Sequence, residues 1–234
     1  MKAVLLIGGF STKLRPLTLT LPLPLLEFCN QELLMHQLRA LKDAGVSEVL
    51  ICVHERVVPA SWDAYVTKCE AELSMRIRSA KEDVALGTAG PLKAAEAMIL
   101  AEGEAEAPFI VVNADVLCNY PLRDLLHVHM KHAREATVLT TRCADQKATS
   151  RYGVCVVDEH SGRVRHFVNK PQTYVSDVIN AGVYVFSPSI FARIQDGVKV
   201  RVLGLTSPWL PLFPLLLRAA ALTHALAVHV HRSR

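Results

Sequence analysis

The sequence predicts an α/β protein built on a doubly wound, mostly parallel sheet, and three observations support this fold class. Five short runs are apolar at nearly every position, which is typical of strands that are covered on both faces. Segments with apolar residues at helical spacing lie between these runs. The first run ends in two glycines, Gly8 and Gly9. Strands that alternate with helices indicate βαβ units, whose ligands collect at the carboxyl ends of the strands.

The predicted elements follow one another in the order that this fold class requires. Strands are expected at residues 3–9, 48–54, 109–115, 136–142 and 182–187, and helices at 31–45, 90–103 and 122–133. Gly45 suits the end of the first helix as a C-cap, and Pro91 suits the first turn of the second. Residues 151–171 differ, because two short alternating segments flank the turn sequence DEHSG. This pattern predicts a β-hairpin that forms a lid or wall over the site.

Composition separates a domain, residues 1–197, from an apolar tail, residues 198–234. With 234 residues, of which 51% are hydrophobic, the chain can bury a large core. The tail is rich in leucine, alanine and proline and contains no acidic residue, and its prolines interrupt any continuous helix. The apolar stretch after Pro214 falls short of the roughly 20 residues that a membrane span needs. We therefore expect a docking helix in the tail and no membrane anchor.

Charge and cysteine content narrow the class of ligand and the compartment. A net charge of +4 and an isoelectric point near 8.8 fit a protein that binds small anionic molecules. No dense stripe of Lys and Arg is present, which argues against nucleic acid as a partner. The six cysteines are scattered without a C-x-x-C pair, and the first residues lack the pattern of a secretion signal. We expect reduced, mostly buried thiols and a cytoplasmic protein.

The segment after the first strand has the features of a phosphate-binding loop. A glycine turn such as Gly8-Gly9 lets backbone N–H groups converge on an anion without interference from a Cβ atom. Thr12, Lys13 and Arg15 add a hydroxyl group and two cations beside that turn. The alternative is a strand-ending glycine pair with ordinary surface charges, because such pairs are common. The loop alone therefore does not decide the function.

Two further segments place acidic or small residues at predicted ligand positions. Asp115 closes an apolar strand, and a carboxylate at the carboxyl end of a strand suits Mg²⁺ because hard cations prefer oxygen. The alternative for Asp115 is a role in a turn. Gly87 lies in the segment LGTAG, where small residues let a base or a ribose approach the backbone. The alternative there is a simple helix N-cap formed by Thr88.

Weaker signals come from single side chains. Lys170, in FVNKP, offers a cation for a phosphate, and Asn180, in INAG, offers an amide that both donates to and accepts from sugar hydroxyls. His127, His129 and His132 lie in one predicted helix, where only the last two share a face. We interpret these histidines as a solvated helix face rather than a metal site.

Seven motifs in the same order along the chain carry a family resemblance. They are GG-x-x-T-K-L-R-P-L-T, PLLEFCN, LGTAGPL, NADV, YGV, FVNKP and INAGVYVFSP. Together they resemble the nucleotidyltransferase domain of sugar-1-phosphate nucleotidylyltransferases, in particular of GDP-mannose pyrophosphorylases (mannose-1-phosphate guanylyltransferases), over roughly residues 1 to 195. The resemblance implies a Rossmann-like sheet of the nucleotide-diphospho-sugar transferase type, without the β-helix domain of full-length members.

The resemblance also implies a reaction and a set of residues. GTP and mannose 1-phosphate would give GDP-mannose and pyrophosphate by in-line attack of the sugar phosphate on the α-phosphorus, without a general base. The implied catalytic residues are Lys13, Asp115 and Lys170, with Asp115 as the Mg²⁺ ligand. The implied nucleotide-binding residues are Gly8, Gly9, Thr12, Arg15 and Gly87, and the implied substrate-binding residues are Gly153, Asn169 and Asn180.

Departures from the family pattern GG-x-G-T-R-L…P-K-P bear on activity. The third glycine of that pattern is Ser11 here, the arginine is Lys13 and the lysine is Leu23. Lysine lacks the bidentate grip of a guanidinium, and leucine removes a cation outright. Asn169 stands where the family has a glutamate, and the second metal-binding aspartate, in a W-x-D-x-G stretch beyond residue 200, has no counterpart. We therefore expect weak or absent turnover.

Three alternatives stay open. The first is a non-catalytic regulatory homologue that binds GDP-mannose and works through an interface, in a hetero- or homo-oligomer with a pyrophosphorylase subunit. The second is a nucleotidylyltransferase for another pair of substrates, such as UTP and glucose 1-phosphate. The third is a chain with a disrupted C-terminus and no stable function.

Overall fold

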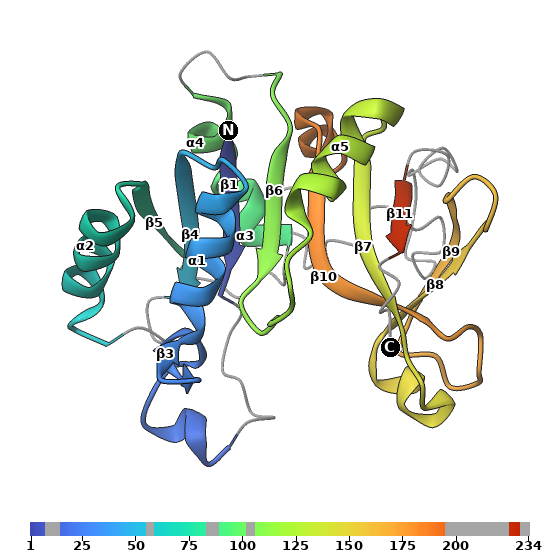
Figure 1. Ribbon diagram of the computed structural model, residues 1–234, viewed down its shortest axis with the longest axis horizontal. Coiled ribbons are helices and arrows are strands. Elements are labelled where there is room, and N and C mark those ends of the chain that lie inside the picture. The colour runs from blue at the N-terminus through green and yellow to red at the C-terminus, as the bar shows by residue number, and fades with distance from the viewer. Residues whose placement is uncertain (8–14, 55–58, 83–88, 102–105, 195–224, 230–234) are drawn as a thin grey trace.

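The central sheet can be traced in a computed structural model, which describes residues 1–7, 15–54, 59–82, 89–101, 106–194 and 225–229. Its strands are β1 (Lys2–Leu6), β4 (Glu48–His54), β5 (Arg76–Glu82), β6 (Phe109–Asn113), β7 (Ala136–Arg142), β8 (Gly153–Val157), β9 (Val164–Asn169), β10 (Val178–Phe186) and β11 (Ala225–His229). Their order is β11-β7-β10-β6-β1-β4-β5, with β8 paired to β10 and β9 to β8 (Figure 1). β2 (Glu27–Phe28) and β3 (Gln31–Glu32) form a separate antiparallel pair.

Parallel strands make up the half of the sheet that contains the first strand. β1 pairs parallel with both β4 and β6, and β5 pairs parallel with β4. Leu6 is the register partner of Asn113, so β1 and β6 end at the same level of the sheet. In the other half, β10 runs antiparallel to both β6 and β7, and the pairs β10–β8 and β8–β9 are antiparallel too. The predicted fold class is confirmed, with β10 as an antiparallel strand inside the sheet.

Helices cover both faces of the sheet, which explains the continuous apolar runs. Leu5 packs into a cluster with buried residues of α1 (Leu33–Asp43), α2 (Trp62–Leu73) and α5 (Leu122–His132). Its neighbour Val4 points to the opposite side, because successive side chains of a strand alternate. There it joins a cluster with α3 (Ala89–Ala94), α4 (Glu96–Leu100) and the 3₁₀ segment Pro188–Arg193. Figure 1 shows α1 lying over β1 and β4, on the side facing the viewer.

Element boundaries agree with the sequence where the pattern is strong and differ elsewhere. β4, β7 and α5 lie where they were predicted, and the expected hairpin is β8–β9. The second predicted helix is divided at Ala95 into α3 and α4, and α2 and β5 were not predicted. In the described ranges, no helix is both long enough and apolar enough to cross a membrane. None of the six cysteines, all of which lie in the described ranges, forms a disulfide, and Cys52, Cys69 and Cys155 are buried.

The described piece of the tail is a strand, where the sequence analysis expected a docking helix. β11 pairs parallel with β7, with Ala225 opposite Ala136 and His229 opposite Thr140. Without β11, one side of β7 would be an open sheet edge with unpaired backbone N–H and C=O groups. Pairing with these groups is a physical reason for residues 225–229 to form a strand. Most of the tail, including residues 198–224, lies outside the described residues.

His129 is a second correction, because it lies in the core and not on a solvated face. The side chain is 2% exposed, and its Nδ1 and Nε2 atoms lie 2.8 Å from Thr137 Oγ1 and 3.1 Å from Ser187 Oγ. The Ser187 hydroxyl donates to the Arg134 carbonyl, so it accepts from Nε2–H, and Nδ1 accepts from Thr137. A neutral imidazole therefore satisfies both of its ring nitrogens within the fold.

Burial of His129 predicts that the protein loses stability in mild acid. Burial lowers the pKa of this imidazole to about 4. Between pH 6.5 and 4 the unfolded chain binds a proton that the folded chain does not, so stability is complete above pH 6.5 and falls by about 1.4 kcal/mol per pH unit below it. Urea unfolding at pH 7.5, 6.0 and 5.0 should show this slope. His129→Gln should flatten it, whereas His127→Gln, an exposed position on the same helix, should leave it unchanged; equal slopes in all three proteins would contradict the prediction.

Candidate active site

A turn at the carboxyl end of β6 carries the first predicted site residue, Asp115. In this segment, which we call the Asp115 turn (residues 113–116), the Val116 N–H donates to the Asn113 carbonyl at 3.2 Å. The Ala114 N–H donates to the Leu6 carbonyl at 3.0 Å, which ties the turn to the last residue of β1. The Asp115 side chain is exposed. An accessible carboxylate therefore stands beside the end of the first strand.

An irregularity in β10 lies directly against the Asp115 turn. The register between β10 and β7 shifts between Asn180 and Tyr184, and Gly182 has a φ of +80°. A Cβ atom on Gly182 would lie 2.8 Å from Val116 Cγ2 and 2.9 Å from Asn113 Nδ2, so only glycine allows this approach. The Gly182 N–H donates to Asn180 Oδ1 at 3.0 Å. The contact places Asn180 and the Asp115 turn in one neighbourhood.

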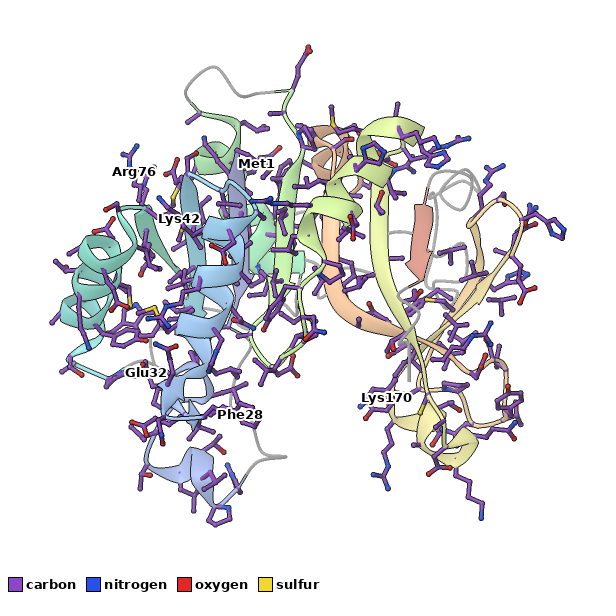
Figure 2. All side chains as sticks on the ribbon, viewed as in Figure 1. Met1, Phe28, Glu32, Lys42, Arg76 and Lys170 are labelled. Atoms are coloured by element: carbon purple, nitrogen blue, oxygen red, sulfur yellow. The ribbon has the colours of Figure 1, made fainter. Side chains whose placement is uncertain are left out.

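The hairpin β8–β9 continues the site on the other side of Asn180. A Cβ atom on Gly153 would lie 3.8 Å from Asn180 Cβ, and Gly153 is the register partner of Asn169. Lys170 follows, exposed, with its N–H donating to the Tyr152 carbonyl at 2.9 Å. Figure 2 labels Lys170 near the lower end of this hairpin, and the β6 arrow in Figure 1 points toward the same lower edge.

Lys170 also has an unusual backbone conformation. Its φ is 50°, in the left-handed region that residues other than glycine rarely adopt. Such a conformation costs about 1–2 kcal/mol in an L-residue. Strained residues of this kind are concentrated at active and ligand-binding sites. Ser74 and Ala133, at the ends of α2 and α5, share this conformation, so the backbone of Lys170 does not by itself mark a functional position.

Contacts between neighbours thus link five predicted residues in one group. Gly182 joins the turn that carries Asp115 to Asn180, and Gly153 joins Asn180 to Asn169 and the following Lys170. Arg15 is exposed, and the contacts given above do not include it. The remaining predicted residues are Gly8, Gly9, Thr12, Lys13 and Gly87, and they lie outside the described residues. The end of β1 at Leu6 is nevertheless described, and the Ala114 hydrogen bond holds it beside the Asp115 turn.

Two residues that the sequence analysis missed connect the parts of this group. Tyr184 is 3% exposed, and its hydroxyl accepts a hydrogen bond from Asn180 Nδ2 at 2.7 Å. Burial raises the pKa of Tyr184 to about 12, and contacts with the Asn180 and Asn113 amides act against that rise. The Tyr184 hydroxyl and the Gly182 N–H therefore hold the Asn180 side chain in one orientation, and the Asn113 amide contacts the same hydroxyl. A polar residue inside an apolar strand was the available signal.

The oxygen-donating groups near the Asp115 turn fit a magnesium ion with few protein ligands. Among the residues that the structure describes, no group of three or more His, Cys, Asp or Glu side chains could hold a metal. A single exposed carboxylate suits Mg²⁺, which is commonly bound through one or two carboxylates together with water and substrate phosphates. Asp115 is the side chain that would hold such an ion here.

The fold and this group of residues define an α/β protein with a candidate ligand site at the carboxyl edge of a partly parallel sheet. Comparison with protein families gives the class more closely, because the family described as "Nucleotidyl transferase" matches residues 2–201. The chain belongs to the nucleotidyl transferase family.

Curated relatives within this family carry more specific names. The chain is 45% identical over 195 residues to the mannose-1-phosphate guanylyltransferase catalytic subunit beta of Dictyostelium discoideum and 44% identical to that of Danio rerio. It is 42% identical to mannose-1-phosphate guanylyltransferase 1 of Arabidopsis thaliana. Each match covers 83% of this chain and 52% of the relative, so the chain spans about half the length of the curated relatives it matches.

Solved structures support the fold. A crystal structure described as a glucose-1-phosphate thymidylyltransferase of Bacillus anthracis superposes with a TM-score of 0.81 at 17% identity, covering 99% of this chain and 87% of that one. HddC of Yersinia pseudotuberculosis superposes with a TM-score of 0.70 at 22% identity, covering 97% and 89%. At these identities the likeness concerns the fold.

Proposed function

We propose that the chain is a nucleotidyltransferase that forms GDP-mannose and pyrophosphate from GTP and mannose 1-phosphate, with weak turnover. The observation that carries the proposal is the continuous group from Asp115 to Lys170, beside the end of the first strand. The relatives' names support the choice of guanine nucleotide and mannose, and the expected compartment is the cytoplasm.

In this proposal the residues act by positioning and by neutralising charge. The phosphate of mannose 1-phosphate is already ionised at neutral pH, so it attacks the α-phosphorus of GTP without a general base. Lys170 would contact the sugar phosphate, and the backbone at Gly8 and Gly9, with Lys13, would contact the triphosphate. Mg²⁺ held at Asp115 would neutralise charge on the phosphate oxygens. Neutralisation of this kind favours loss of pyrophosphate.

Asn180 has limited capacity left for the sugar. Its Oδ1 accepts from the Gly182 N–H and its Nδ2 donates to the Tyr184 hydroxyl. One N–H and one lone pair then remain for mannose hydroxyls. The two internal hydrogen bonds fix the direction of these groups, so we propose that Asn180 selects the orientation of the sugar ring.

Two measurements test the proposed function. Calorimetric titration with GTP and with GDP-mannose in Mg²⁺ should give binding heat, and pyrophosphate release should depend on GTP, mannose 1-phosphate and Mg²⁺ together. UTP with glucose 1-phosphate serves as the competing substrate pair. Absence of heat from both guanine nucleotides would contradict the proposal.

Removal of the Asp115 carboxylate gives a sharper test of the proposed metal ligand. Asp115→Asn should lower the Mg²⁺-dependent rate by about 10²–10³-fold, because the amide keeps the shape and loses the charge that holds the cation. Asp124→Asn, an exposed aspartate on α5, is the matched control and should keep the wild-type rate. Equal rates in the two variants would exclude Asp115 as the ligand.

A second candidate function rests on the departures from the family pattern in the segment after β1, residues 8–24. Leu23 stands where the family pattern has a lysine, and two of the relatives are named as catalytic subunits. A non-catalytic partner that binds GDP-mannose is consistent with both observations. Co-purification with an intact pyrophosphorylase, in the absence of any pyrophosphate release by this chain alone, would favour this candidate.

A further inference from the structure

A polar residue lies on the buried face of α1. Gln37 is 1% exposed and stands between Leu34 and Leu41, which are equally buried. The helix packs with this face against the central sheet, in the cluster that contains Ala114 and Val116 of the Asp115 turn. Polar side chains in such a position are uncommon, because their amide must find partners inside the core.

The Gln37 amide finds its partners on both sides of Asp115. Gln37 Nε2 donates to the Asn113 carbonyl at 3.1 Å and to the Val116 carbonyl at 2.8 Å. The Tyr120 hydroxyl donates to the same Val116 carbonyl at 2.5 Å. One side chain from α1 therefore bridges the first and the last residue of the turn that carries Asp115.

The carbonyl oxygen of the Gln37 side chain indicates that this glutamine does not serve to stabilise the fold. Gln37 Oε1 is buried and, within the described part of the chain, has no hydrogen-bond partner. A buried acceptor without a partner costs about 1–3 kcal/mol. The two carbonyls also have other donors, the Val116 N–H and the Tyr120 hydroxyl. A leucine at position 37 would remove the unpaired oxygen and would leave neither carbonyl without a donor.

We propose that Gln37 is a positioning residue for Asp115, which fixes the backbone on both sides of the carboxylate so that it holds a divalent cation on the bound nucleotide. The inference rests on the proposed function for the identity of the cation and the nucleotide. Gln37 touches neither ligand and acts through the Asn113 and Val116 carbonyls. Residues that orient a metal ligand in this way typically change metal affinity or activity about 10–100-fold when they are replaced.

The test compares Gln37→Leu with two other variants in the full chain. Tyr120→Phe removes only the hydroxyl donor to Val116 and serves if Gln37→Leu does not fold. Leu41→Ala truncates a buried side chain one turn further along α1 and is the control for a general loss of stability. Two readouts are taken well below the melting temperature of every variant. They are amide hydrogen exchange at Ala114 and Val116, and the ratio of GTP affinities measured by calorimetry in EDTA and in Mg²⁺.

We expect Gln37→Leu to speed amide hydrogen exchange in the Asp115 turn about tenfold or more, and to leave exchange at Leu50 in β4 unchanged. The same variant should reduce the gain in GTP affinity that Mg²⁺ gives by about tenfold or more. Leu41→Ala should keep that gain, and Tyr120→Phe should lower it less than Gln37→Leu does. If Gln37→Leu keeps the full wild-type gain in GTP affinity from Mg²⁺, the positioning role of Gln37 is overturned and the proposed function is not. A wild-type chain that binds no GTP in Mg²⁺ would overturn the proposed function, and the positioning role would fall with it.

Discussion

Replacement of Ser11, Lys13 and Leu23 by glycine, arginine and lysine is expected to raise the rate of pyrophosphate release about 10²–10³-fold. The arginine restores a planar group that contacts phosphate oxygens at two points, and the lysine restores a cation. Leu23 begins the 3₁₀ turn Leu23–Leu25 and is partly exposed, so a lysine ammonium there can reach water or a phosphate while its stem stays on the protein surface. Ser11 and Lys13 lie outside the described residues.

A charge-matched control separates a specific effect from general attraction of GTP. Leu19→Lys adds one positive charge at an exposed position of the same segment, where the side chain is 66% exposed. It should leave the rate unchanged. An unchanged rate in the triple variant, with GTP binding intact, would contradict the view that the loop limits turnover. The second metal-binding aspartate of the family pattern, for which we expect no counterpart in this sequence, would then be the next cause to test.

Gly182→Ala is expected to destabilise the folded chain by about 2–4 kcal/mol, because it combines a left-handed backbone with a steric collision. The collision is with Asn113 and Val116, the two ends of the Asp115 turn. For a chain of this size the melting temperature should fall by roughly 5–15 °C. Urea unfolding followed by circular dichroism measures the change.

Two other glycines separate the backbone cost of Gly182→Ala from its steric cost. Gly45 has a φ of +88° with no atom within 4 Å of an added Cβ, so Gly45→Ala isolates the backbone term, about 1–2 kcal/mol. Gly153→Ala isolates a steric term, because the added Cβ would lie 2.5 Å from the Phe167 ring. The loss in Gly182→Ala should exceed that in Gly45→Ala. Equal losses would contradict the steric part of the prediction and would show that the Asn113 and Val116 side chains move aside at no measurable cost.

Strong hydrophobic patterns made most of the sheet predictable. β4 is apolar from Val49 to Val53, and β7 is buried from Ala136 to Thr140 with threonines among its apolar residues, so their limits could be read from the sequence. β5 could not, because only Ile77 and Ala80 of its sequence RIRSAKE are apolar, and their spacing is not that of a strand face. β5 lies at the edge of the sheet. α2 was missed for a similar reason, since only Trp62, Val66 and Cys69 of its twelve residues are buried.

Candidate site residues could be predicted from the sequence when they lie in a motif. They could not be predicted when their role depends on a contact between distant parts of the chain. Asp115, Asn180 and Lys170 lie in motifs, and the described contacts place them in one group. The roles of Gln37 and Tyr184 depend on which backbone groups lie opposite them across the core, and no local pattern encodes this. A glutamine one residue before Leu38, on an otherwise apolar helix face, was the only sign.

β10 contacts both the Asp115 turn side of the candidate site, through β6, and the hairpin side, through β8. This limits how the protein can be re-engineered. One continuous strand pairs with β6 at Val183–Phe186 and with β8 at Ile179. A hairpin β8–β9 that is grafted alone from another member of the nucleotidyl transferase family would pair with a β10 strand of a different sequence from its own. The smallest unit for such an exchange is the whole segment from residue 143 to residue 187, moved in one piece. The Cys143 N–H donates to the Asp177 carbonyl near its beginning, and the Ser187 N–H donates to the Glu135 carbonyl at its end.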